Sequence, residues 1–149
     1  MLRYRWLAGL ALLTIAVFLT SCSGSATSLD TQRWIEHWGD QEMKTLTLDV
    51  GRVGSDANTL DSETALHLDC AKAARDAEMA LGHPPPDSTV AVWMDPVRKL
   101  HRDALSCSYA AASGGFGTDP TDIILADANI VKTDLTSVKA GFKTLVRGA

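Results

Sequence analysis

Residues 119–145 read DPTDIILADANIVKTDLTSVKAGFKTL, and this stretch decides the fold. Asp119 suits the N-cap of a helix, Pro120 suits its first residue, and Asp122 favours the positive end of the helix dipole. Apolar residues follow at alternating intervals of four and three: Ile124, Ala128, Val131, Leu135, Val138, Phe142 and Leu145. They form one face of a long helix, and that face requires partner helices to cover it.

The preceding segment, residues 90–111, has the same apolar spacing. Its apolar positions are Val90, Trp93, Val97, Leu100, Ala104, Cys107 and Ala111. A proline inside a helix normally breaks it. The pattern nevertheless keeps its register on both sides of Pro96, so we predict one helix that begins near Asp87 or Ser88 and bends near Pro96. The glycine-rich residues 113–117 predict the end of this helix and a mobile loop.

A shorter helix is predicted from Asp61 or Ser62 to Leu81, because Gly82 follows as a stop signal. Its inward positions are His67, Cys70, Ala74, Ala77 and Leu81. Most of these side chains are small, so a neighbouring helix can approach closely. Residues 83–86, His-Pro-Pro-Pro, form a stiff extended connector.

The first segment of the domain, residues 43–60, is ambiguous. Helical spacing joins Met43, Leu46, Val50, Val53, Ala57 and Leu60. Gly51 and Gly54 each disfavour a helix by about 1 kcal/mol relative to alanine. Residues 45–50 also alternate like a strand, but no other stretch offers a strand to pair with. We therefore predict a helix here, and four amphipathic helices with short connectors predict an all-α, four-helix up-down bundle.

The chain begins with MLRYRWLAGLALLTIAVFLTSC, residues 1–22. Arg3 and Arg5 precede an uncharged apolar run, which is the layout of a secretory signal and too short for a convincing membrane-spanning helix. The last four residues, Leu-Thr-Ser-Cys, resemble the lipobox of bacterial lipoproteins. The resemblance implies cleavage before Cys22, a diacylglyceryl thioether on its sulfur and, usually, acylation of the new amino terminus. The alternative is an ordinary signal with an incidental cysteine.

This division gives three parts: a signal peptide of residues 1–21, a lipidated Cys22 with a flexible tether through residue 29, and a helical domain of residues 30–149. Fatty acyl chains such as palmitate would then hold the protein at the cell membrane, on its extracytoplasmic face. Loss of Arg3 and Arg5 takes the net charge from −4 to about −6. An acidic surface argues against binding to nucleic acid.

With Cys22 assigned to the lipid, Cys70 and Cys107 remain as a pair. Both lie on the inward face of consecutive helices, and thiols outside the cytoplasm normally oxidise where geometry permits. We predict a disulfide between them; the alternative is two separate buried thiols.

Motifs for catalysis and metal binding are mostly absent from the sequence, and we expect neither an enzyme nor a cofactor. Glu63 and His67 lie one turn apart and form a candidate metal pair, but we favour a packed, hydrogen-bonded histidine as the interpretation of His67. Asp49, Asp56 and Asp69 match no calcium-loop spacing.

Trp34, His37 and Trp38 lie together at the start of the first predicted helix of the domain. Tryptophan is enriched in binding hot spots, so these residues are candidates for a partner surface or pocket. The alternative is that they close the open end of the bundle core.

The mature chain is similar to small, all-helical, two-cysteine lipoproteins of actinobacteria. The similarity lies in the tryptophans at the start of the first helix, Cys70, the Pro84–Asp87 connector, Trp93 and Cys107. It implies no activity. We therefore expect a non-enzymatic, lipid-anchored module that binds an unknown protein or other component of the cell envelope. The alternative is a carrier of a small ligand or metal in a cavity between helices, using His67 and Glu63.

Overall fold

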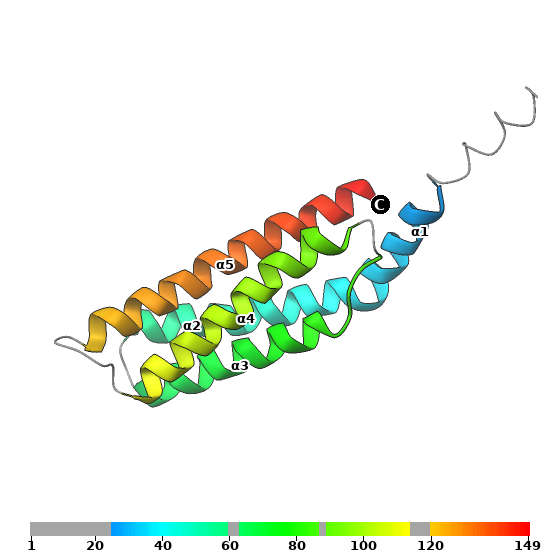
Figure 1. Ribbon diagram of the computed structural model, residues 1–149. Helices are drawn as coiled ribbons and strands as arrows, with labels where there is room; N and C mark the ends of the chain where they lie inside the picture. The colour runs from blue at the N-terminus through cyan, green and yellow to red at the C-terminus, as the bar shows by residue number, and fades with distance from the viewer. Residues whose placement is uncertain (1–24, 60–62, 87–88, 114–119) are drawn as a thin grey trace, which may run out of the picture.

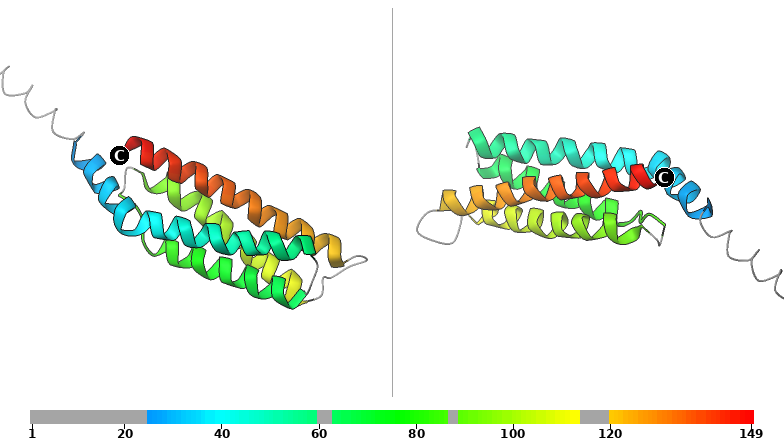
Figure 2. Two further views of the ribbon diagram at one scale, coloured as in Figure 1. Left: turned by 180° about the vertical axis from the view of Figure 1, so that it is seen from behind. Right: turned by 90° about the horizontal axis from the view of Figure 1, so that it is seen from above.

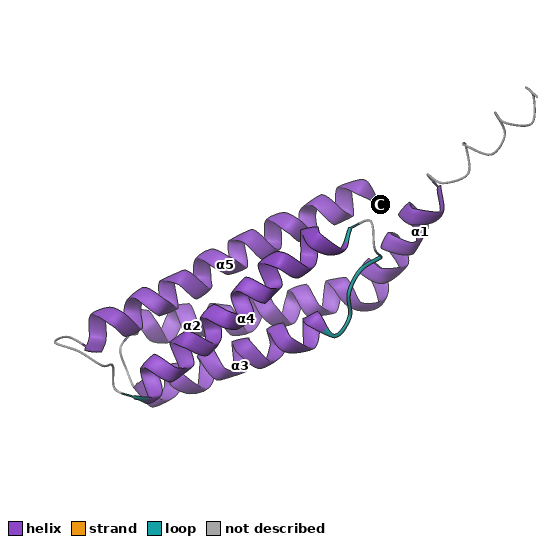
Figure 3. Cartoon of the chain, in the orientation of Figure 1, coloured by secondary structure: helices purple, strands orange, loops and turns teal. Residues whose placement is uncertain are grey.

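The computed structural model describes residues 25–59, 63–86, 89–113 and 120–149 (Figure 1). The elements run in the order α1 (Ser25–Trp34), η1 (Ile35–Gly39), α2 (Asp40–Thr59), α3 (Glu63–Leu81), α4 (Val90–Ala112) and α5 (Pro120–Gly148). All are α-helices except η1, which is a five-residue π-helix. Figure 3 shows that no strand occurs among these residues, which confirms the all-α class. The expected signal, Cys22, the expected helix starts at residues 61–62 and 87–88, and the glycine-rich loop after Ser113 lie outside the described residues.

Helices α2 to α5 form the bundle. Each packs against two neighbours, because α2 contacts α3 and α5, while α4 contacts α3 and α5. Consecutive helices lie side by side and run in opposite directions (Figures 1 and 2). The four helices therefore enclose one core along their length. None of the described helices is long and apolar enough to span a membrane.

The predicted apolar faces supply that core. On α5, Ile124, Ala128, Val131, Leu135, Val138 and Leu145 are buried, and Phe142 is partly buried against them. On α4, Trp93, Val97, Leu100, Ala104, Cys107 and Ala111 are buried in the same way. Helix α5 begins at Pro120, as its sequence predicts. Spacing alone therefore located the two longest helices correctly.

The ambiguous first segment is helical. Leu46, Val50 and Val53 of α2 are fully buried, which confirms the helical spacing over the strand-like alternation of residues 45–50. Their burial against α3 and α5 outweighs the low helix propensity of Gly51 and Gly54.

Helix α4 runs through its internal proline without interruption. Pro96 has no N–H, so it donates no hydrogen bond to the carbonyl of Val92 one turn earlier. Val97 and Leu100 after the proline are as fully buried as Trp93 before it. Packing on both sides of Pro96 therefore holds the helix together.

Residues 25–29 differ from their sequence prediction. They form the first turns of α1 rather than an irregular tether. Thr31, Trp34 and Ile35 are buried, so this part of the chain packs on the bundle. A packed turn of this kind nucleates a helix, and helical hydrogen bonds then extend toward the N-terminus at small entropic cost.

The disulfide between Cys70 and Cys107 is present, with Cα atoms 5.8 Å apart. It joins α3 to α4 in the interior, where both cysteines are fully buried. The sequence prediction of one inter-helix disulfide is confirmed.

Candidate functional site

Trp34 belongs to the core. Its side chain is only 7% exposed, and its Nε1–H donates a hydrogen bond of 2.9 Å to the carbonyl oxygen of His83. Its ring meets the ring of Trp93 edge-on, with 5.3 Å between centroids, and Trp93 meets Phe142 in turn at 5.9 Å. Trp34 therefore closes the end of the core, one of the two roles that its sequence position left open.

The turn after Trp34 is shaped to accept its ring. A Cβ atom on Gly39 would lie 2.8 Å from the ring of Trp34 and 2.9 Å from that of Phe142. Gly39 ends the π-helix, and the N–H of Asp40 bonds back to the carbonyl of Ile35 across the wider turn. Only a residue without a side chain fits under the two rings.

Trp38 lies on the surface instead. It is 38% exposed, and its ring stacks on the imidazole of His83 with 3.7 Å between centroids and 9° between planes. His37, also exposed, meets Trp38 edge-on at 4.8 Å. The Nδ1 atom of His83 lies 3.1 Å from Oε1 of Glu42. Two ring contacts thus hold the indole of Trp38 while part of it faces solvent, and the polar contact with Glu42 holds the imidazole of His83 beneath it.

His83 and Glu42 were not among the site residues predicted from the sequence. Only a weak signal pointed to His83: it stands at the start of a stiff proline run, and the candidate surface tryptophans lie elsewhere in the chain. The structure brings the two segments together because the α3–α4 connector passes the end of η1 (Figure 1).

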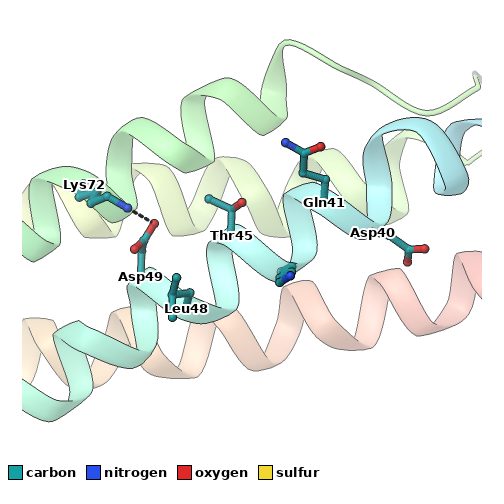
Figure 4. Close-up of a pocket in the computed structure, with 7 residues that line it drawn as sticks. Asp40, Gln41, Thr45, Leu48, Asp49 and Lys72 are labelled. Carbon is teal, nitrogen blue, oxygen red and sulfur yellow. Dashed lines mark hydrogen bonds and ion pairs between the residues drawn. The ribbon is translucent and has the colours of Figure 1, made fainter.

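A groove continues from this end along α2. It has a volume of about 540 Å³ and is lined by Asp40, Gln41, Lys44, Thr45, Leu48, Asp49 and Lys72 (Figure 4). Gln41 lies three residues after Trp38, and residues at this spacing are neighbours on a helical surface. Leu48 is 57% exposed. We call Trp38, Gln41, Lys44 and Leu48 the Trp38 surface.

Beneath the groove lies a buried carboxyl pair. Asp49 of α2 and Asp76 of α3 are 1% and 4% exposed, and Lys72 places its Nζ 2.5 Å from Asp49 Oδ2 and 3.5 Å from Asp76 Oδ2 (Figure 4 shows the Asp49 contact). Each aspartate keeps one buried oxygen that accepts no hydrogen bond from the donors of the described residues. While Asp76 is protonated, the proton held between the two carboxyl groups satisfies both oxygens.

The charges of this pair follow from its surroundings. Burial raises the pKa of Asp76 to about 6, and its hydrogen bond with Asp49 and the charge of Asp49 act in the same direction. Burial also acts to raise the pKa of Asp49, but hydrogen bonds from Asp76 and Lys72 outweigh it and lower that pKa below its usual value. Below a pH of about 6, Asp76 is therefore the donor and Asp49 the ionised acceptor, with Lys72 and Arg52 as the counter-charges of Asp49.

The same arrangement recurs between α4 and α5. Lys99 lies 2.8 Å from Asp103, four residues later on α4, and 2.5 Å from Asp134 of α5, which is 2% exposed. Burial raises the pKa of Asp134, whereas the hydrogen bonds that Asp103 accepts from Lys99 and Asp134 outweigh its own burial and lower its pKa. In each case a lysine bridges its own i+4 aspartate and an aspartate on the adjacent helix.

A third carboxyl pair joins α2 and α3. Burial, together with a hydrogen bond that the protonated Asp69 carboxyl donates to Asp56, raises the pKa of Asp69. Asp49, which was considered together with Asp56 and Asp69 in the sequence, pairs with Asp76 instead. No cluster of three potential metal ligands occurs among the described residues. The carboxylates of α2 and α3 therefore act in pairs that connect the helices.

His67 is engaged by α4. Its Nδ1 lies 2.9 Å from the carbonyl oxygen and 3.0 Å from Oγ of Ser108. A carbonyl oxygen only accepts, so the Nδ1–H donates to it. This is the packed, hydrogen-bonded histidine that the sequence left as one alternative; the side chain of Glu63, its candidate metal partner, lies outside the described residues.

In comparisons with protein-family models, curated proteins and solved structures, the chain has no match.

Proposed function

We propose that this chain is a non-catalytic binding module, anchored by lipid on Cys22 to the extracytoplasmic face of a bacterial membrane, and that it binds an envelope protein through the Trp38 surface. The observation that supports this proposal is the partly exposed, immobilised indole of Trp38, which lies beside an open groove.

Binding through Trp38 is favourable in both conformational entropy and buried area. A tryptophan that already stacks on His83 loses little side-chain freedom on binding, so most of the free energy from its buried area remains available. Aromatic anchors of this kind dominate protein interfaces. Leu48 adds a further exposed apolar side chain, two to three turns further along the chain on α2.

The binding part can be tested by photo-crosslinking in cells. A photoreactive amino acid replaces Leu48, and proteins crosslinked to it are recovered and compared with those crosslinked from Leu105, an exposed leucine on α4. We expect a specific partner from position 48, absent from position 105, and lost when Trp38→Ala is added while the disulfide and helical content are retained. Identical sets from both positions would contradict the proposed surface.

The anchor requires a separate test, because a soluble exported protein could use the same surface. Mass spectrometry of the mature amino terminus is expected to show a diacylglyceryl-modified Cys22, and Cys22→Ser is expected to abolish acyl labelling. An unmodified cysteine, or a mature chain that begins after it, would refute the anchor and leave the binding proposal to stand on the crosslinking result.

A further inference from the structure

A second groove lies on a different face, between α2 and α5. Its volume is about 520 Å³, and its α5 wall consists of Lys132, Leu135, Thr136 and Lys139. Its α2 wall includes Gly51 and Gly54. The groove at the Trp38 surface lies between α2 and α3 and shares no lining residue with it.

The groove is cationic in an acidic protein. The chain carries 18 Asp and Glu against 14 Lys and Arg, yet no carboxylate lines this groove. Lys72 and Lys99 are committed to buried aspartates. Lys132 and Lys139 make no ion pair with any residue of the described ranges. Two positive charges therefore face the groove without a protein counter-charge.

The spacing aligns these cations. Lys132, Thr136 and Lys139 stand at positions i, i+4 and i+7 of α5, so they share one face. Seven residues of α-helix rise about 10 Å. Flexible lysine stems from two such positions can converge on one anion or contact two successive ones.

Gly54 positions one of the lysines. A Cβ atom at Gly54 would lie 3.0 Å from Cδ and 3.2 Å from Cε of Lys132. The glycine therefore allows the Lys132 stem to lie flat across α2. A stem that is already packed loses less conformational entropy when its ammonium group binds.

Gly51 has no such packing role. A Cβ atom there would meet nothing within 4 Å, so alanine would fit the fold and would favour the helix. Glycine at this point instead leaves the floor of the groove open beside Thr47. Glycine at position 51 therefore lowers the stability of the helix but leaves room for a ligand in the groove.

We propose that the α2–α5 groove binds a phosphate ester that carries hydroxyl groups. Lysine is a point-charge ligand suited to the tetrahedral phosphate group, whereas planar carboxylates favour the fork of arginine, which is absent from this groove. The Thr136 hydroxyl donates to the Lys132 carbonyl, so its oxygen accepts a hydrogen bond from a ligand hydroxyl. The inference does not depend on the partner proposed for the Trp38 surface.

The test is a titration of the full chain in dodecyl maltoside micelles, followed by backbone amide NMR shifts of residues 131–140. One arm adds glycerol 3-phosphate, and the other adds phosphatidylglycerol to the micelles. We expect saturable shifts in at least one arm, weakened at least about tenfold by Lys132→Gln with Lys139→Gln, because the double variant loses both charge-assisted contacts. Saturation in the soluble arm identifies a free ester, and saturation in the lipid arm alone identifies a headgroup.

Two controls separate a site from general charge attraction. Lys143→Gln together with Arg147→Gln removes the same charge outside this groove and should change the affinity less than twofold. Gly51→Ala should raise Tm by a few degrees while it weakens binding, since it fills the floor without harming the fold. No saturable shift in either arm, or an equal loss in the control pair, would overturn the proposal.

Discussion

The carbonyl oxygen of Val92 faces Gly141 across the α4–α5 interface so closely that a Cβ atom on Gly141 would lie 2.4 Å from it. Pro96 explains why this carbonyl is available, because a proline one turn later provides no N–H to bond it. The Pro96 ring also lies 3.6 Å from the same point. Pro96 of α4 therefore frees the carbonyl group of Val92, and Gly141 of α5 leaves the space that this carbonyl group occupies.

Gly141→Ala is expected to destabilise the fold by about 1–3 kcal/mol, because the added methyl forces α4 and α5 apart at a backbone contact. Urea unfolding followed by circular dichroism measures the change. Gly148→Ala on the same helix meets nothing within 4 Å and serves as the matched control. Equal stability of the two variants would show that the interface yields easily at this point.

Reduction of the Cys70–Cys107 disulfide is expected to lower the free energy of unfolding by about 3–4 kcal/mol. The bond closes a loop with a sequence separation of 37, and its loss increases the entropy of the unfolded chain. Urea titrations with and without a reductant measure the effect on one sequence. A Cys70→Ala, Cys107→Ala variant should show no response to the reductant.

The stability of the fold should depend on pH through Asp76. Its pKa rises from 3.8 to about 6 on folding, so the folded chain holds a proton that the unfolded chain releases between these values. This contribution is fully present below pH 3.8 and is lost as pH rises through 6. Asp76→Asn should therefore reduce the fall in unfolding free energy between pH 4.5 and pH 7.

The comparison variant for this pH measurement is Asp95→Asn. Asp95 is exposed and pairs with Arg98 on the surface of α4. Its replacement should leave the pH profile parallel to that of the unaltered chain. If Asp76→Asn also gives a parallel profile, the carboxyl pair does not share a proton in the folded state.

Trp34→Phe should cost about 1–2 kcal/mol. Phenylalanine preserves most of the ring packing but cannot donate to the carbonyl of His83, which then loses its indole partner. Trp38→Phe, which retains a ring for stacking on His83, should change stability by less than about 0.5 kcal/mol. Thermal unfolding of the two variants side by side distinguishes the core tryptophan from the surface one.

The bundle itself could be predicted because its signal is periodic. Burial of one helical face requires apolar residues at intervals of three and four, and residues 124–145 carry that pattern without a gap. The disulfide followed from the same faces, since both cysteines lie on them. Helix α1 could not be predicted, because residues 25–29 have no period and their helix extends from the packed turn at Thr31–Ile35.

The polar contacts were beyond sequence reasoning for a different reason. Asp49 precedes the core position Val50, and nothing in its local sequence distinguishes it from an exposed aspartate. Its burial depends on the distance between α2 and α3, which small residues such as Ala73 and Ala77 set. The contact between Trp38 and His83 likewise depends on the path of a connector, which only the assembled bundle defines.

The lysine-bridged aspartates have a consequence for motion. One pair fixes the axial alignment of α2 with α3, the other fixes α4 with α5, and the disulfide fixes α3 with α4. None of these three fasteners crosses from α5 back to α2. The α2–α5 interface is therefore joined by none of these three links. We expect the slow opening of the native state, measured by amide hydrogen exchange, to begin at this interface.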